Sequence, residues 1–424
     1  MTTEQKAGPT VPEAALAGIR VVEIGVAMAG PFCAMTLGDY GADVIKIERP
    51  GEGDDSRAWP PYFHGSMGYY YASANRNKRG IALDLKHPEG VAAARALIEG
   101  ADVLVTNYRA GVLDRLGLGW AELSRANPRL IYCSISGFGS TGPLAAQPAN
   151  DLFMQAYSGG MSITGEVGGS PAKMGISVAD IGGGMFAAIG VLTALQARHA
   201  TGLGQQVDTS LLEGQIAMLA HFLTRHFASG EVPGPSGSGA LSSPIYRAFQ
   251  GSDDWIVIAA FNQRMWQGLC RALEREAWID DERFADARVR SLHRQELIAL
   301  IAEVVSQHPV AYWTARLAGQ GVPCSPVNKI DQVVAQPQVQ AAHLIEDLEL
   351  PGLGPMRMAG LPFRLGDTPG AVRLPPPRLG QHTAEVLNEL GYTAQQLEEL
   401  AARRVIGLDH GWRQYAPAQP EVQA

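Results

Sequence analysis

The feature that most constrains the fold is an alternation of short β-branched runs with helical segments over residues 18–135. Residues 18–25 are a β-branched run ending in glycine, residues 30–40 are rich in Ala, Met and Leu, and residues 42–48 are β-branched again. Strand, helix and strand in so compact a span form a βαβ unit with parallel pairing and a right-handed crossover. The pattern recurs, with strands at 81–85, 101–106 and 130–135 and helices at 88–100 and 120–126. The sequence therefore predicts a doubly wound parallel α/β sheet whose strand ends open onto a ligand crevice.

Changes in composition divide the rest of the chain. A long apolar helix at about 182–200 is followed by a turn, a strand and another helix that ends near Phe227. Gly and Pro then dominate, as in a flexible linker or an active-site loop. A later strand with several helices indicates a smaller α+β domain, and two final amphipathic helices are expected to return to the first domain. The predicted segments are a disordered tail at 1–14, the first part of the large domain at 15–227, a Gly/Pro loop at 228–240, the small domain at 241–347, and an extended return with C-terminal helices at 348–424.

Charge and cysteine content narrow the class of partner and the compartment. The net charge is -8 and the pI is about 5.7. Because nucleic acids and anionic membranes bind basic domains, these values argue against either as the main partner. The four cysteines have no CxxC or zinc-ligand spacing, as is typical of reduced cytosolic thiols. The apolar stretch at 181–197 contains glycines and polar residues that suit a buried helix better than a membrane span. We expect a cytoplasmic protein with no nucleic-acid or membrane partner.

Several common catalytic motifs are absent from the sequence. The first βα turn reads GVAMAGP at residues 25–31 instead of GxGxxG, which argues against a generic NAD enzyme. The GxSxG elbow of a serine hydrolase is missing as well. Because the histidines lack metal-ligand spacing, we expect no metal site.

One carboxylate is set apart by its surroundings. Asp180 heads the most apolar helical run of the chain, and no other charge occurs between Lys173 and Arg198. An N-cap is the more common role for such a residue, because Asp is a favoured cap and suits the positive end of a helix. A desolvated nucleophile, left open by the neighbouring glycines, is the alternative.

Basic residues gather in the segments that follow the first strands. They could bind a phosphate-rich ligand through the forked hydrogen bonds of arginine. They could equally form a solvated face, because Glu52, Asp54 and Asp55 are interleaved with them. The residues concerned are Lys46, Arg49, Arg57, Arg76, Lys78, Arg79, Arg109 and Arg115.

An ordered series of motifs points to a family. The string VVEIGVAMAGPFCAMTLGDYGADVIKIERP at 21–50 resembles the opening of the class III coenzyme A transferases, the formyl-CoA transferase-like family, which includes carnitine CoA-transferase and α-methylacyl-CoA racemase relatives. The resemblance covers the chain from about Leu16 to Leu408. Further similar motifs are NRNKR at 75–79, NYRAG at 107–111, SGFGSTGP at 136–143, GLGQQVD at 202–208, GVP at 321–323 and LGQHT at 379–383.

The resemblance implies a Rossmann-like large domain built from both ends of the chain, a small domain between them, and an interlocked, ring-like homodimer. It also implies that Asp180 forms covalent intermediates and that coenzyme A is bound as the acyl-CoA substrate, with no permanently bound cofactor. At Ser136 the sequence departs from formyl-CoA transferase, which has a CoA-binding lysine there. The resemblance assigns to the coenzyme A site Ala27, Met28 and Ala29 as its lining, Arg49, Asn107, Tyr108 and Arg115 as contacts to the nucleotide or pantetheine, and Lys78 and Arg79 as neighbours of the 3′-phosphate.

The expected function is transfer of CoA from an acyl-CoA to a carboxylic acid through aspartyl anhydride and aspartyl-CoA intermediates. The closest resemblance is to transferases that use succinyl-CoA and a dicarboxylate, and Arg57, His64 and Arg247 are candidates for binding a second carboxylate. A racemase is the runner-up, because it needs a His-Asp pair where this chain has Asn150 and Asp151, and asparagine cannot shuttle protons. A CoA-binding protein without turnover is the third alternative. The residues do not identify the acids exchanged.

Overall fold

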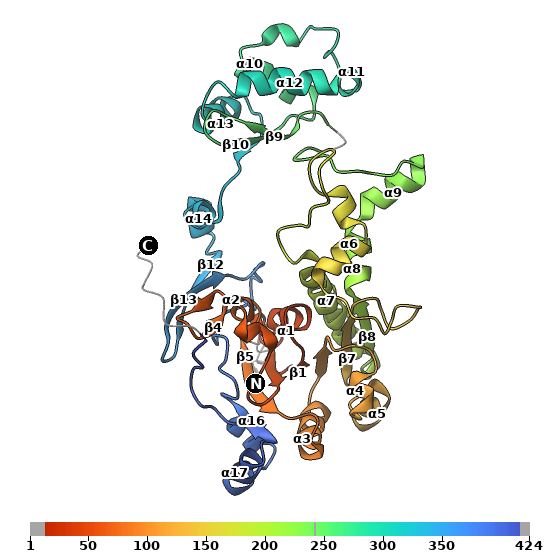
Figure 1. The fold of residues 1–424 in the computed structure, drawn as a ribbon, viewed down its shortest axis with the longest axis vertical. Helices are drawn as coiled ribbons and strands as arrows, with labels where there is room; N and C mark the ends of the chain where they lie inside the picture. Colours follow the sequence, from red (N-terminus) through yellow and green to blue (C-terminus); the bar gives the residue numbers. More distant parts are fainter. Residues whose placement is uncertain (1–12, 241–242, 416–424) are drawn as a thin grey trace, which may run out of the picture. The chain divides into compact units, whose positions relative to one another are not determined.

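The computed structural model describes residues 13–240 and 243–415, which form two compact units (Figure 1). The large unit comprises the residues up to 158, residues 175–221 and residues 340 onward, and the small unit comprises residues 159–174 and 222–339. The predicted tail at 1–14 lies outside the described residues, apart from Glu13 and Ala14.

A seven-stranded sheet forms the centre of the large unit, in the order β14-β5-β2-β1-β6-β7-β8. Every neighbouring pair is parallel except β14 with β5. The prediction of a parallel sheet is therefore confirmed for all strands but the edge, where β14 comes back antiparallel from the C-terminal segment. The strands are β1 (Arg20–Ile24), β2 (Asp43–Glu48), β5 (Lys78–Leu83), β6 (Val103–Thr106), β7 (Ile131–Ser136), β8 (Gln206–Ser210) and β14 (Ile406–Gly407).

Helices cover both faces of this sheet. Alternate residues of a strand point to opposite faces, and in β1 Val22 and Ile24 belong to one buried core while Val21 belongs to the other. The core of Val22 includes residues of α3, α5, α16 and α17, and the core of Val21 includes residues of α1, α6, α7 and α8. The helices are α1 (Ala29–Asp39), α3 (Pro88–Glu99), α5 (Trp120–Ala126), α6 (Asp151–Tyr157), α7 (Val178–Thr201), α8 (Leu211–Met218), α16 (Thr383–Glu389) and α17 (Ala394–Ala402).

The glycines of α7 allow neighbouring helices to pack against its backbone. A Cβ atom at Gly184 would lie 2.7 Å from the carbonyl oxygen of Ala29, and one at Gly183 would lie 2.8 Å from Leu211 Cδ2. Helices α1 and α8 therefore approach α7 more closely than side chains at these positions would permit. By length and composition α7 could cross a membrane, but half of its most apolar window is buried inside the fold.

Short elements complete the large unit. The return segment that was predicted as extended begins instead with an antiparallel hairpin of β12 (Ile345–Leu350) and β13 (Gly354–Ala359). Its Leu350 and Met356 pack against Met67 and Tyr71 in a separate small core, which gives the hairpin an apolar face to cover. The other elements are the antiparallel pair β3 (Tyr62–Phe63) and β4 (Met67–Gly68), with α2 (Tyr69–Ser73) and α4 (Val112–Arg115).

The small unit contains a three-stranded antiparallel sheet in the order β11-β10-β9, with a core around Trp266 and Phe284. It also includes residues 159–174, which the predicted domain division placed in the large domain. Within the unit this segment is joined to the glycine-rich loop by a hydrogen bond from Gly237 N to Gly165 O at 2.9 Å. The elements are β9 (Tyr246–Gln250), β10 (Trp255–Ala259), β11 (Cys324–Pro326), α10 (Gln263–Ala272), α11 (Ala287–Leu292), α12 (Arg294–Val305), α13 (Val310–Gly319) and α14 (Ile330–Val334), while α9 (Ala220–Ser229) and α15 (Pro337–Ala341) lie at the unit boundaries.

Candidate active site

The sheet topology places its switch point between β1 and β6. From β1 the chain proceeds outward through β2 and β5 on one side, and from β6 through β7 and β8 on the other. Ligands of open α/β sheets bind at such a switch point, outside the carboxyl ends of the strands. There the loop after β1 meets Asn107, which follows β6. Val26 N donates to Asn107 Oδ1 at 2.9 Å, and Asn107 Nδ2 donates to Val26 O at 2.8 Å.

The backbone of this loop is held at three consecutive residues. Besides the bonds of Val26, the carbonyl oxygen of Gly25 accepts from Lys46 Nζ at 2.9 Å, and Ala27 N donates to both carboxylate oxygens of Asp54, at 3.1 and 3.2 Å. Ala27 has φ 61°, a left-handed conformation that costs a residue with a Cβ about 1–2 kcal/mol. The loop is therefore fixed by the side chains of Lys46 in β2, of Asn107 just after β6 and of Asp54, in a conformation that it would not keep alone.

A buried charge cluster lies beneath the loop. Lys46 Nζ contacts Glu23 Oε1 at 2.7 Å and Asp54 Oδ2 at 3.1 Å, and the side chains of all three residues are fully buried. Burial by itself lowers the pKa of Lys46, but the charges of Glu23 and Asp54 outweigh this effect and the pKa is raised. Burial would raise the pKa of Asp54, but Lys46 and the hydrogen bonds of Ser56 lower it to about 2. Lys46 and Asp54 are therefore both ionised at neutral pH, and their ion pair holds the floor of the loop in place.

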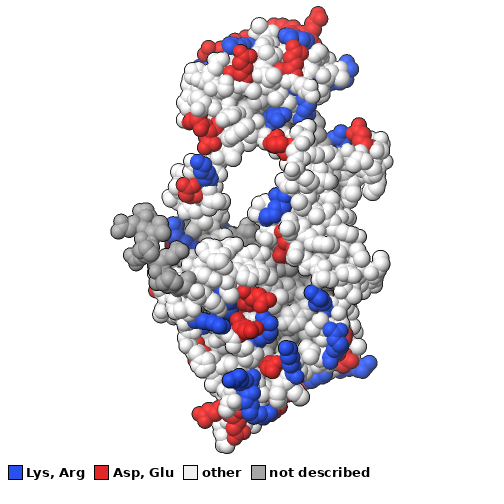
Figure 2. Space-filling model, viewed as in Figure 1, with Lys and Arg blue, Asp and Glu red and all other residues white. Residues whose placement is uncertain are grey.

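Half of the predicted basic cluster, namely Lys46, Arg57, Arg76 and Lys78, is buried inside the fold instead of forming a phosphate-binding face. Lys78 is fully buried, donates to Pro31 O, Ala74 O and Asn75 Oδ1, and lies 2.7 Å from Glu23 Oε2 in an ion pair without hydrogen-bond geometry. Burial lowers the pKa of Lys78 to about 8. The expectation of a solvated or ligand-binding surface is wrong for the buried cations, because each of them already has a carboxylate partner. Lys46 pairs with Asp54, Arg57 with Glu48, Arg76 with Asp39 and Lys78 with Glu23. On the face drawn in Figure 2, the exposed charges of both signs are interspersed.

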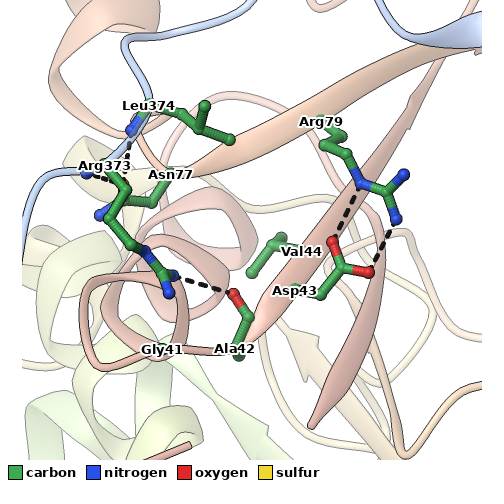
Figure 3. A pocket seen from close by; sticks show the side chains of 8 residues that line it. All are labelled: Gly41, Ala42, Asp43, Val44, Asn77, Arg79, Arg373 and Leu374. Atoms are coloured by element: carbon green, nitrogen blue, oxygen red, sulfur yellow. Dashed lines mark hydrogen bonds and ion pairs between the residues drawn. The ribbon is translucent and has the colours of Figure 1, made fainter. Parts of the chain in front are cut away.

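Arg79 lies at the opposite edge of the sheet from the crevice. It is near the amino end of β5, where it pairs with Asp43 at 2.7 Å and with Glu389 at 2.5 Å. Figure 3 shows it on the wall of a cavity of about 320 Å³, where it points to Asp43, while Arg373 on another wall donates to the carbonyl of Ala42. The cavity adjoins the amino ends of β2 and β5. The structure thus places Arg79 away from the predicted coenzyme A site, and it buries Lys78 behind the loop of that site, where Nζ donates to Pro31 O at 2.9 Å.

The other predicted residues lie at the carboxyl edge. Met28 and Ala29 are buried where α1 begins, and Arg49 directly follows β2, half exposed and paired with Asp55 at 2.5 Å. Tyr108 follows Asn107, and its pKa is raised by burial although Lys46 and Arg49 oppose this. The exposed Arg115 ends α4. The sequence analysis did not single out Lys86, an exposed cation just beyond the carboxyl end of β5; the predicted strand at 81–85 began three residues after β5 begins and ended two residues after β5 ends.

Ser136 has a local role at the end of β7. Its hydroxyl accepts a hydrogen bond from Gly139 N at 2.9 Å and so closes the turn that follows the strand. The serine contributes no positive charge at the position where formyl-CoA transferase has a lysine. The exposed or half-exposed cations that follow the carboxyl ends of β2, β5 and β6 in the described structure include Arg49, Lys86, Arg109 and Arg115.

Asp180 lies in the first turn of α7 and is not its cap. The N-cap position is Ser177, and the carboxylate that accepts from the end of the helix is Asp151, whose Oδ1 binds Ala179 N at 2.9 Å. Asp151 does not cap its own helix α6, because Asn150 Oδ1 accepts from Phe153 N in that role. Among the described residues no donor forms a hydrogen bond with the Asp180 carboxylate. Burial, and secondly the charge of Asp151, raise the pKa of Asp180 to about 7.

Asp180 lies on the face of α7 that packs against the start of α1. Residues four apart share a helix face, and one turn further on Gly184 packs against the carbonyl of Ala29. Tyr70 completes this part of the site: its hydroxyl lies 3.2 Å from Ser177 Oγ, and its pKa is raised by burial, with Asp180 as a further contributor. The sequence analysis did not consider the run of three tyrosines at 69–71, which could have pointed to Tyr70 as a site residue.

Comparison with known proteins identifies the family. The model of CoA-transferase family III matches residues 16–383, and the chain belongs to this family. It is a class III acyl-CoA:carboxylate CoA-transferase, an enzyme that moves CoA between acyl-CoA thioesters and carboxylic acids.

The relatives cover nearly the whole chain. A succinyl-CoA:glutarate CoA-transferase of Homo sapiens is 36% identical over 392 residues, 92% of this chain and 90% of that relative. A succinate–glutarate CoA-transferase of Agrobacterium fabrum is 39% identical over 381 residues, 88% of this chain and 95% of the relative. Among solved structures, a CAIB/BAIF family protein from Brucella suis matches with a TM-score of 0.81 and 36% identity, covering 89% of this chain and 99% of that one.

Proposed function

We propose that the protein transfers CoA from an acyl-CoA to a dicarboxylic acid through covalent intermediates on Asp180. The observation that carries this proposal is a partly buried carboxylate that no donor in the described structure engages and whose pKa burial raises to about 7. A carboxylate that has lost its water shell without gaining hydrogen bonds is a stronger nucleophile than one in solution. A helix cap, in contrast, would spend its oxygens on backbone N–H groups.

The chemistry proceeds in four displacements. The Asp180 carboxylate attacks the thioester carbonyl and expels CoA thiolate, which leaves a mixed anhydride. The thiolate attacks the aspartyl carbonyl and releases the donor acid as a carboxylate, so that Asp180 carries CoA as a thioester. The acceptor carboxylate attacks this thioester and expels the thiolate again, and the thiolate attacks the acceptor acyl carbon, which frees Asp180 and the new acyl-CoA.

The coenzyme A site of the proposal is the β1–β6 crevice. The fixed loop at 25–27 offers a backbone that needs no rearrangement on binding. Arg49, Asn107, Tyr108 and Arg115 keep the roles that the family resemblance implies, with Asn107 also holding the loop. Lys78 and Arg79 are withdrawn from the site because of their burial and their position.

The choice of a dicarboxylic acceptor is supported by the relatives. Three of them are named for succinyl-CoA or succinate and glutarate, and others for mesaconate, D-citramalate and oxalate, all of which are dicarboxylic acids. Their names apply to those proteins. We take over the shared chemical class and no individual acid.

We also propose a cytoplasmic homodimer, interlocked as the family resemblance implies. Apolar side chains are exposed on neighbouring helices of the large unit, a pattern typical of a surface that pairs with another protein. They are Leu152, Phe153 and Tyr157 on α6, Met185, Ile189 and Leu192 on α7, and Ile216 and Met218 on α8. Sedimentation equilibrium tests the dimer, and a monomer with native circular dichroism at micromolar concentration would contradict it.

The covalent step is tested by trapping. The protein is incubated with succinyl-CoA, treated with hydroxylamine or borohydride, and digested for mass spectrometry. We expect the modification on Asp180, none in Asp180→Asn, and an unchanged yield in Asp208→Asn, which alters an exposed aspartate of β8. Modification at another residue, or undiminished transfer by Asp180→Asn, would disprove the mechanism.

A further inference from the structure

The three candidates for a second carboxylate site differ in what their side chains already bind. Arg57 is buried and forms a two-point ion pair with Glu48, at 2.8 and 2.6 Å. His64 Nε2 lies 2.9 Å from the carbonyl oxygen of Pro355. Arg247 forms no ion pair with any carboxylate of the described residues. Its guanidinium therefore keeps its hydrogen-bonding capacity for a ligand.

Arg247 lies against the backbone of the glycine-rich loop in the small unit. It is the second residue of β9, paired with Ile258 of β10. A Cβ atom at Gly239 would lie 3.2 Å from Arg247 Cβ and 3.5 Å from both Cζ and Nη1. The absence of a side chain at Gly239 thus gives the guanidinium direct access to the loop backbone.

The loop itself is ordered by its own hydrogen bonds. Ser236 Oγ donates to Gly239 O at 2.5 Å, and Ala248 N donates to Ser238 Oγ at 3.3 Å. Ala240 N donates to Tyr246 O at 2.9 Å, which joins the loop to β9. Two loop hydroxyls and a strand of the sheet therefore hold the backbone next to Arg247 in place.

A second guanidinium reaches the next residue of the loop. Arg294, the first residue of α12, donates from Nη2 to Ala240 O at 2.6 Å. Its pKa is lowered by burial and then by the positive charge of Arg247, so the two cations are close enough to repel each other. Glu166 also lies against the loop, at Gly237, but forms no ion pair with Arg247. An anion between the two guanidinium groups would relieve their repulsion.

We propose that Arg247 and Arg294, together with the loop residues at 236–240, form a binding site for a carboxylate group of a dicarboxylic acid. The planar guanidinium matches a carboxylate with two parallel hydrogen bonds, which an amide or hydroxyl side chain cannot supply. The choice of a carboxylate over other anions rests on the proposed function, whereas the presence of an anion site rests on the paired cations alone.

Binding is measured without turnover, so that the outcome is independent of the transfer chemistry. Glutarate is titrated calorimetrically into the full-length protein at constant ionic strength, with butyrate and sulfate as comparison ligands. We expect Arg247→Gln to weaken glutarate binding about tenfold or more, because a charge-assisted hydrogen bond is lost. Arg264→Gln removes an exposed arginine of α10 in the same unit and should leave the affinity unchanged.

A chemical readout identifies the residue directly. Glutarate should slow the modification of Arg247 by phenylglyoxal, and it should do so equally in Asp180→Asn, which has no transfer activity under the proposed function. Gly239→Ala places a Cβ 3.2 Å from Arg247 Cβ, a tight contact that the loop or Arg247 must relieve by a small shift, so it should weaken binding while near-ultraviolet circular dichroism stays native. Equal glutarate affinity in wild type and Arg247→Gln, no protection of Arg247, or competition by sulfate as effective as that by glutarate would each overturn the proposal.

Discussion

Asp54→Asn tests whether the buried charge beneath the β1 loop organises the coenzyme A site. The carboxylate accepts from Ala27 N, from Ser56 N at 3.0 Å and Oγ at 2.6 Å, and contacts Lys46 Nζ at 3.1 Å. An asparagine amide keeps one acceptor oxygen, and its NH₂ group must face a donor, either Lys46 or the backbone of Ala27. The substitution therefore leaves at least one buried donor unsatisfied.

The size of the effect follows from the pKa of Asp54. Its value of about 2, against 3.8 for an unperturbed aspartate, corresponds to about 2 kcal/mol in favour of the ionised form in the folded state. Because the folded pKa is depressed, this stability is present above pH 4 and is lost as the pH falls toward 2. We expect Asp54→Asn to lower the free energy of unfolding by about 2–3 kcal/mol at pH 7, and the difference from wild type to shrink below pH 4.

The functional consequence concerns binding more than chemistry. Without Asp54, Ala27 is free to leave its left-handed conformation, so the KM for acyl-CoA should rise several-fold while kcat changes little. Urea denaturation and steady-state kinetics measure the two effects. The control Asp55→Asn alters the neighbouring exposed carboxylate, whose surface ion pair contributes about 0–1 kcal/mol, and should unfold almost as wild type does. A wild-type KM together with a wild-type urea midpoint in Asp54→Asn would refute the reasoning.

Three further predictions concern α7. Asp151→Asn removes a negative charge near Asp180 and should lower the pKa of Asp180, so that the acid limb of the kcat/KM profile moves to lower pH; a fixed limb would exclude the coupling. The pKa of Asp180 is about 7 in the folded protein and 3.8 in the unfolded chain, so the wild-type protein should lose stability as the pH rises from 4 through 7. Asp180→Asn has no carboxylate to ionise, and its Tm should therefore rise relative to that of wild type between pH 5 and pH 8. A constant Tm difference across this range would contradict it. Gly184→Ala should lower the free energy of unfolding by about 1–3 kcal/mol, measured by chemical denaturation, because its Cβ would lie 2.7 Å from Ala29 O. Gly100→Ala is the control, since its Cβ meets only ordinary contacts. Equal stability of the two variants would show that α1 and α7 separate freely.

Periodicity predicted the elements that lie in the sheet and its covering helices. The helix at 120–126 matches α5 residue for residue, and the strands at 101–106 and 42–48 contain β6 and β2. Such segments bury one or both faces, and burial is what a periodic pattern records. The hairpin of β12 and β13 was missed, because its pairing depends on a small core with Met67 and Tyr71, far away in sequence.

Local sequence could not reveal which charges are buried. NRNKR at 75–79 has the composition of a surface run, yet Lys78 is fully buried because Glu23, from a different strand, supplies its counter-charge. The same limit affected Asp180. Its cap role was favoured by local statistics and was wrong, since Asp151 from another helix takes the backbone N–H instead.

The cluster under the loop contains as many acids as bases: Glu23, Glu48 and Asp54 face Lys46, Lys78 and Arg57. The charges of the six residues add to zero, but they do not separate into three isolated pairs, because Lys46 and Glu23 each contact two partners. A mutation that neutralises a single member strands an ion in a medium that cannot solvate it, whereas the simultaneous loss of an acid and its base leaves the sum intact. We therefore expect these six buried positions to tolerate the coordinated replacement of an acid together with its base better than any single replacement.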